Sequence, residues 1–227
     1  MTKNSLENGD LKILVLCEDL KSFRDYLKKY LKEINYIPSH TSSAKNYILI
    51  KTINCHKIII EIRKANGTQA LCILDEAKLE KDNYDQIFME FDFDGNKQNA
   101  IDKRKAYKEV MEQILPAKIK TIHFYFCFET WLFLHFGEGE GRKFNSSDEI
   151  KKEINTKLTK LNIPPYDKSE FKQQTFDFFY NKLNIAIQMA KNINKNNKKE
   201  GIGLLDFFDY IYNVEKDLKD KKIEETR

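Results

Sequence analysis

The chain has 227 residues, of which 41% are hydrophobic and 33% charged, enough apolar side chains for one sizeable core or a core with a smaller extension. Its 39 basic and 35 acidic residues give a formal net charge of +4, so a surface that binds nucleic acid would have to be a local patch. Only eight glycines and four prolines are present, which excludes collagen-like and low-complexity disordered proteins.

Disulfides, zinc sites and membrane segments are not indicated either. The four cysteines lack C-x-x-C spacing, and Cys17, Cys72 and Cys127 lie in apolar runs where a thiol behaves as a small hydrophobe. Residues 1–10 contain no apolar signal-peptide core, and no apolar run approaches the ~18 residues of a membrane span. We therefore expect a cytoplasmic protein that has no membrane partner.

The first predicted unit is a strand followed by a helix. Lys12–Cys17 is a dense apolar run that ends at Glu18, as expected of a strand buried on both faces. Apolar residues then recur at helical spacing over residues 20–34, with lysines on the opposite face. Tyr47–Ile53 predicts a second strand, whereas the β-branched run Ile58–Ile62 fits either a strand or a helix.

The middle of the chain alternates helices and strands. Thr68 is expected to cap a helix. Gln86–Phe91 predicts a strand that runs into the segment Asp92–Asp94, and a further helix then leads to a predicted strand at Lys118–Phe126. This alternation is typical of a parallel sheet covered by helices on both faces.

Beyond the glycine-rich turn GEGEG only helices are predicted. A capping-box pattern at Ser146 begins one helix. One long helix is expected to carry Phe176–Ala190, and a last amphipathic helix to carry Leu204–Tyr212, followed by a solvated helix end or frayed tail. We therefore divide the chain into an α/β domain over residues 1–137 and a helical extension over residues 138–227 that packs on it.

Acidic side chains follow two of the predicted strands. Glu18 follows the first, and Asp92 and Asp94 follow the strand at Gln86–Phe91. Ligands of open parallel sheets lie outside the carboxyl ends of the strands, so if these strands are neighbours the carboxylates meet and repel unless a cation screens them. Hard oxygen ligands favour Mg²⁺ or Mn²⁺, which typically act on phosphates. The alternative interpretation has no metal site: the D-x-D pattern occurs by chance in an acidic loop, and Glu18 is only a neighbour of a helix N-terminus.

The aromatic segment Cys127–Phe136 holds two further candidates. On a helix Glu129 and His135 would lie some 120° from facing together, so they are not expected to share a ligand. For His135 we favour a hydrogen-bonded structural histidine over a catalytic one. Glu129 is costly to bury unpaired, so it either caps the helix start or points into the acidic site. Trp131 is expected in the core.

Basic residues after the Asp motif are candidates for contact with nucleic acid. Lys97 and Arg104 could track a phosphate backbone, together with Lys103 and Lys105. The alternative interpretation is a solvated helix face.

Three segments, in this order, resemble the RloB-like family of Toprim proteins. ILVLCEDLKSFRDYLKKYL, IFMEFDFDG and CFETWLFLHF resemble the family's strand ending in Cys-Glu-Gly, its Asp-x-Asp strand and its C-F-E-x-W-L-x-L-H-F segment. The third segment is the most specific, and the likeness spans roughly residues 11–136. Asp19 stands where the family usually has Gly, and Gly95 where a third acidic residue is common.

The resemblance implies an α/β Toprim-like parallel sheet flanked by helices. It implies a metal site of Glu18, Asp92 and Asp94 for Mg²⁺ or Mn²⁺, with Glu18 as general acid/base, and we count Glu129 with them among the catalytic candidates. It further implies a nuclease of bacterial anti-phage defence that works with an ATPase of the ABC or AAA type encoded nearby, on RNA or DNA. The alternative is a non-catalytic module that senses nucleic acid or a nucleotide and regulates the ATPase.

Overall fold

The computed structural model describes residues 9–18, 21–43, 46–67, 69–92, 105–110, 112–113, 116–124, 127–139, 144–196 and 202–225. The elements in chain order are β1 (Leu11–Cys17), α1 (Ser22–Glu33), β2 (Ile37–Pro38), β3 (Asn46–Ile53), β4 (His56–Lys64), α2 (Ala70–Glu80), β5 (Gln86–Asp92), β6 (Ile119–Phe124), α4 (Phe128–Leu134), α5 (Ser147–Lys160), α6 (Gln173–Asn181), α7 (Leu183–Asn196) and α8 (Leu204–Glu225). A further helical stretch covers residues 105–110.

The strands form one sheet in the order β2-β3-β4-β1-β5-β6, which confirms the α/β class. β4, β1, β5 and β6 are parallel neighbours, but β3 is antiparallel to β4. The predicted parallel sheet is therefore confirmed for β4, β1, β5 and β6, and the edge formed by β2 and β3 adds antiparallel strands to it. Only Asn54 and Cys55 separate β3 from β4, both at positive φ of 47° and 69°, and so short a connection makes a hairpin because a parallel crossover needs a dozen residues or more.

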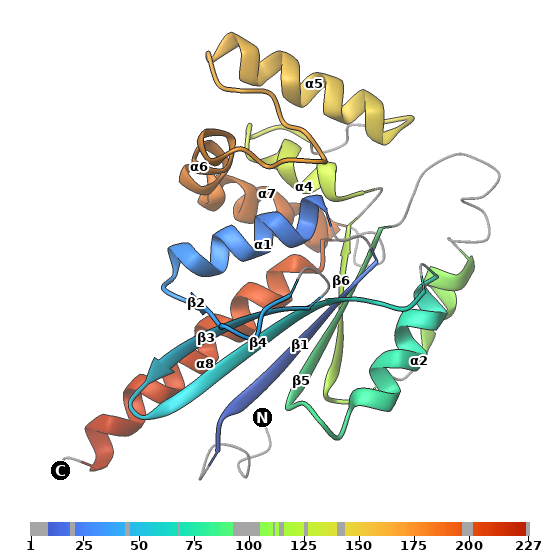
Figure 1. The fold of residues 1–227 in the computed structure, drawn as a ribbon. Helices are drawn as coiled ribbons and strands as arrows, with labels where there is room; N and C mark the ends of the chain where they lie inside the picture. Colours follow the sequence, from blue (N-terminus) through green and yellow to red (C-terminus); the bar gives the residue numbers. More distant parts are fainter. Residues whose placement is uncertain are drawn as a thin grey trace.

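Helices cover both faces of the sheet, as Figure 1 shows. Along β1 the side chains alternate: Ile13 and Val15 belong to a large core with α1 and the C-terminal helices, while Leu14 and Leu16 belong to a smaller core with α2. α4, α5, α6 and α7 gather beyond the carboxyl ends of the parallel strands. That is the end of the sheet where Glu18 and Asp92 lie.

The last helix ties the C-terminal part of the chain to the sheet. Phe207 of α8 packs edge-on against Phe88 of β5, with ring centroids 5.1 Å apart. The ammonium of Lys51 on β3 lies 2.7 Å from the carboxylate of Glu215 on α8. Helices after residue 138 and strands before it therefore share one hydrophobic core.

Several local predictions need correction. The expected long helix is two helices, α6 and α7, which are separated at Lys182. Tyr212 was expected on the apolar face of α8, but it is 69% exposed. Of the two alternatives for the segment after it, the helix end is confirmed as far as Glu225, where α8 ends. α2 begins after Gln69, and Thr68 lies outside the described residues. The cap at Ser146 is confirmed, since its hydroxyl accepts a hydrogen bond from the Glu149 amide. Within the described residues, no helix is both long enough and apolar enough to span a membrane.

Candidate active site

The parallel strands β1 and β5 bring Glu18 and Asp92 together. Cys17 pairs with Glu90 at the end of the β1–β5 ladder. β1 ends there, so Glu18 follows it directly, while β5 continues along β6 to Asp92, its last residue. The backbone amide of Asp92 donates a hydrogen bond to Oε2 of Glu18 at 3.2 Å. The backbone amide of Glu18 lies 3.1 Å from the carbonyl of Glu90 and 3.0 Å from its Oε2. The condition set by the sequence, that the two strands be neighbours, is met.

The donor chemistry of this edge suits a hard divalent cation. Glu18 and Asp92 offer carboxylate oxygens, which Mg²⁺ and Mn²⁺ prefer. The third predicted ligand, Asp94, lies outside the described residues, as do Lys97 and Arg104. In the part of the chain that the structure describes, no three His, Cys, Asp or Glu side chains are grouped to hold a metal ion.

Glu129 lies in the first turn of α4 and is 1% exposed. The hydroxyl of Tyr166 donates to its Oε1 at 2.9 Å, and the ammonium of Lys168 lies 3.0 Å from the same oxygen. These two partners offset the cost of burying the carboxylate. The N-cap of α4 is Cys127, and it makes no side-chain capping hydrogen bond. Glu129 is thus held by residues of the segment that joins α5 to α6.

Electrostatic effects connect Glu129 to the strand ends. Burial raises the pKa of the Cys127 thiol, and the negative charges of Glu129 and Asp92 raise it further. Burial lowers the pKa of Lys168, but the charge and hydrogen bond of Glu129, with smaller contributions from Cys127 and Asp92, together outweigh burial, so that its pKa is raised overall. The Lys168 ammonium is therefore a stable positive charge beside the acidic group, and its side chain is still 40% exposed.

Tyr166 joins the start of α1 to Glu129. Burial and the Glu129 charge raise its pKa, while a side-chain hydrogen bond with Ser22 acts in the opposite direction. The backbone of Tyr166 is clamped by Asn155 of α5, whose amide side chain donates to its carbonyl and accepts from its N–H. The candidate site thus combines the ends of β1 and β5, the starts of α1 and α4, and the segment before α6.

The sequence matches the family model for RloB-like protein over residues 13–205. The chain belongs to the RloB-like protein family. A search among curated proteins found no match. The matched region of this RloB-like protein contains most of β1, all of β5 and α4, and the segment with Tyr166 and Lys168. The family match therefore continues well past residue 136, where the clear sequence likeness ended.

Two residues of the candidate site, Tyr166 and Lys168, were missed from the sequence. Both lie in an irregular segment after Pro164-Pro165, where no periodicity marks a residue as buried or exposed. Glu90 was also missed. A carboxylate inside an apolar strand is unusual enough to mark a candidate residue, and Glu90 is indeed buried, with 3% of its surface exposed.

His135 belongs to an aromatic cluster. Its Nδ1 lies 3.0 Å from the carbonyl of Trp131, and its ring centroid is 5.1 Å from those of both Trp131 and Phe179. Burial lowers the pKa of His135 to about 3, so the ring is neutral at physiological pH. Trp131 is fully buried, as expected. These contacts favour the structural interpretation of His135.

Proposed function

We propose that this RloB-like protein is a metal-dependent nuclease that hydrolyses phosphodiester bonds at a Toprim-like site. The observation that carries the proposal is the contact between the Glu18 carboxylate and the Asp92 amide at the ends of two neighbouring parallel strands. It brings two of the three predicted metal ligands, far apart along the chain, to one edge of the sheet. That edge is where ligands of open α/β sheets bind.

In the proposed site Glu18, Asp92 and Asp94 would hold Mg²⁺ or Mn²⁺. The ion, when bound, supplies Lewis-acid polarisation of a phosphoryl oxygen and a more acidic water. Glu18 is proposed as the general acid/base. The Asp92 amide fixes the orientation of the Glu18 carboxylate, which reduces the reorganisation needed when a proton is transferred.

Lys168 gives the proposed site a positive charge. Its ammonium is held by Glu129 and feels the charge of Asp92, yet the side chain keeps access to solvent. A partly exposed cation in this position can orient a phosphate and stabilise the negative charge that develops during hydrolysis. Glu129 then acts through Lys168, and we assign it as a positioning residue.

We extend the proposal to bacterial anti-phage defence in the cytoplasm, with an ATPase of the ABC or AAA type as partner. Support for this setting comes from membership of the RloB-like family and from the sequence segments that resemble it. RNA and DNA are both retained as substrates.

The test is cleavage of labelled RNA and DNA strands with Mg²⁺ or Mn²⁺, and with EDTA. Asp92→Ala and Glu18→Gln are expected to abolish metal-dependent cleavage while the circular dichroism spectrum stays unchanged. Asp75→Asn removes an exposed carboxylate on α2 and is expected to retain full activity. Retained cleavage in both site variants would refute the nuclease. A wild-type protein that binds nucleic acid but never cleaves it would favour the sensing module.

A further inference from the structure

A row of cations runs along α1 away from the candidate site. Arg24, Lys28 and Lys32 are spaced four residues apart, so they share one face of the helix and span about 12 Å at 1.5 Å per residue. The opposite face, with Phe23 and Leu27, is buried in the core. The helix begins at Ser22, which bonds to Tyr166 of the site. The row therefore starts beside Tyr166, whose hydroxyl donates to the Glu129 carboxylate of the candidate site.

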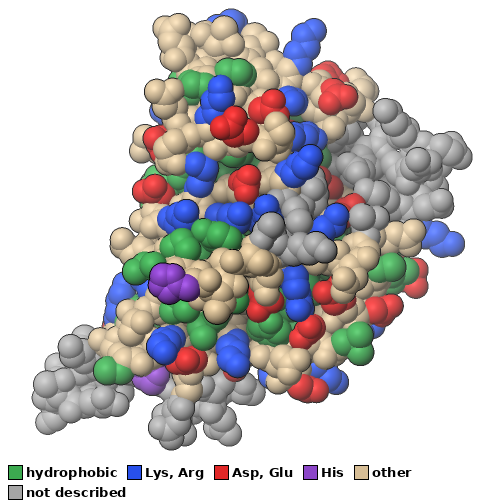
Figure 2. All heavy atoms as spheres, viewed as in Figure 1, with side chains coloured by type: hydrophobic (Ala, Val, Ile, Leu, Met, Phe, Trp, Pro, Cys, Tyr) green, Lys and Arg blue, Asp and Glu red, His purple; other side chains and the backbone are tan. Residues whose placement is uncertain are grey.

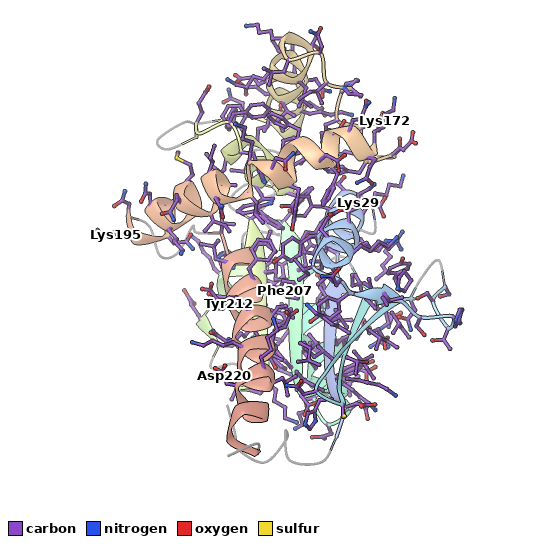
Figure 3. All side chains as sticks on the ribbon, turned by 90° about the vertical axis from the view of Figure 1, so that its left-hand side faces the viewer. Lys29, Lys172, Lys195, Phe207, Tyr212 and Asp220 are labelled. Carbon is purple, nitrogen blue, oxygen red and sulfur yellow. The ribbon has the colours of Figure 1, made fainter. Side chains whose placement is uncertain are left out.

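The last part of this row lines a surface groove of about 310 Å³. Two other elements contribute Tyr47, from β3, and Gln173, from α6. Figure 2 shows Lys and Arg side chains gathered over the region of α1. In Figure 3 Lys29 and Lys172, the residue before α6, lie on the same side of the molecule. The residues that line the groove are Asp25, Lys28, Lys29, Lys32, Glu33, Tyr47 and Gln173.

The cations of the row are crowded. Arg24 Nε and Lys28 Nζ lie 3.8 Å and 3.4 Å from the same oxygen, Oδ1 of Asp25, so one carboxylate is shared between two positive charges. Burial and the charge of Arg24 lower the pKa of Lys28. Like charges four residues apart destabilise a helix. A bound polyanion would relieve this repulsion.

Two of the cations that line the groove, Lys28 and Lys29, are held in place by neighbouring side chains. The ammonium of Lys28 lies 4.2 Å from the ring centroid of Tyr47. Lys29 donates a hydrogen bond to the side-chain carbonyl of Gln173. Ordered cations lose less conformational entropy on binding an anion than long, mobile lysines do. The groove is therefore partly organised for a charged ligand.

We propose that the α1 groove binds the phosphodiester backbone of a nucleic-acid strand and leads it to the Glu18–Asp92 edge. The proposal rests on the proposed nuclease function and names its substrate-binding surface. An evenly spaced row of three cations suits a polymer with a regularly repeated charge, and its start beside the site gives the strand a direction. An acidic protein, whose charges are spaced irregularly, fits this row less well.

The test is fluorescence anisotropy of the full-length protein with labelled single-stranded RNA and, separately, single-stranded DNA, in EDTA over a range of KCl concentrations. Lys28→Ala/Lys32→Ala is expected to weaken binding at least about tenfold at low salt and to reduce the slope of log K against log[KCl] by about 1 to 2. Lys216→Ala/Lys219→Ala removes the same charge from exposed residues of α8 and is expected to change binding less than about twofold.

The single variant Lys32→Glu, at an exposed position, tests the groove without touching the Lys28–Tyr47 contact. It is also expected to weaken binding. Equal binding by the groove variants and the α8 control would overturn the proposal. So would displacement of the strand by poly-glutamate as effectively as by unlabelled nucleic acid at equal charge. Whichever of the two labelled strands, RNA or DNA, binds more tightly identifies the nucleic acid that the groove prefers.

Failure of the groove can be told apart from failure of the nuclease. Binding is measured without metal, and cleavage is measured separately with Asp92→Ala. If Lys28→Ala/Lys32→Ala binds normally and Asp92→Ala loses cleavage, the proposed nuclease function is supported and the proposed binding groove is refuted. If Lys28→Ala/Lys32→Ala loses binding but Asp92→Ala still cleaves, the binding groove is supported and the proposed catalytic site is refuted.

Discussion

The Glu18 carboxylate accepts a 3.2 Å hydrogen bond from the Asp92 backbone amide, across the ends of β1 and β5. The contact lies just beyond the last paired residues of the ladder, Cys17 and Glu90. Its donor is a main-chain group, so the parallel pairing itself sets where the Glu18 side chain points. The arrangement of the proposed site is therefore a consequence of the strand order.

Replacement of Lys168 by Met should lower kcat/KM for cleavage by about 100-fold, because it removes the positive charge beside the acidic group. Lys168→Arg should recover much of the activity, since the charge returns. Lys160→Met, on the exposed end of α5, is the matched control and should behave as wild type. Equal activity of Lys168→Met and Lys160→Met would rule out a role for Lys168.

The hydroxyl of Tyr166 should contribute measurably to stability. Tyr166→Phe leaves buried Glu129 with one hydrogen-bond donor fewer, so we expect the free energy of unfolding to fall by about 1.5–3 kcal/mol. Urea denaturation measures this. Tyr212→Phe removes an equivalent hydroxyl at a position 69% exposed and should change stability by less than about 0.5 kcal/mol. A similar result for both variants would contradict the account of Glu129.

The ion pair between Lys51 and Glu215 should anchor α8 to the sheet. Both side chains are largely buried, and Lys51 also donates to the carbonyl of Ile34 at 2.7 Å. Lys51→Met leaves the Glu215 carboxylate and the Ile34 carbonyl without this donor, so we expect a loss of about 3 kcal/mol in the free energy of unfolding. Lys57→Met, on the exposed side of β4, is the control. A loss no larger than in the control would show that the pair does not anchor α8.

Stability should fall as the pH falls below about 6.5. The pKa of His135 is about 3 in the folded protein and ~6.5 in an unfolded chain, so between these values the unfolded state binds more protons. Acid then favours unfolding by up to ~1.4 kcal/mol per pH unit from this residue. His123, with its pKa lowered by burial to about 4, acts in the same direction.

The measurement is the free energy of unfolding against pH for wild type and His135→Phe. The variant should show a shallower slope between about pH 6 and 4, and His123 should account for part of the remainder. An unchanged slope would mean that His135 is not buried as a neutral ring.

Most strands of the sheet could be predicted from sequence because short apolar runs are a local signal. The meeting of Glu18 and Asp92 could be predicted because residues that follow neighbouring parallel strands lie at the same edge of the sheet, where ligands bind. The β3–β4 hairpin was not predicted, because the β-branched run Ile58–Ile62 fits a strand or a helix equally well and the two-residue connection follows from the strand bounds of the structure. The break at Lys182 was not predicted either, because the apolar spacing of α6 continues into α7.

The contacts of Glu129 could not be predicted in the same way. Tyr166 meets Glu129 across 37 residues, from a segment without regular structure. The sequence left two options for Glu129, capping α4 or pointing into the acidic site. The structure shows it paired with Tyr166 and Lys168, a result of how the α5–α6 segment folds back over α4.

The most direct test of the proposed metal site is calorimetric titration of the protein with Mn²⁺, repeated with Asp92→Asn and with Asp75→Asn. The proposal predicts that wild type and Asp75→Asn bind the ion alike and that Asp92→Asn loses most of the affinity while remaining folded. Undetectable binding by the wild type, or equal binding by Asp92→Asn, would contradict the claim that the carboxylates at the ends of β1 and β5 hold a metal ion.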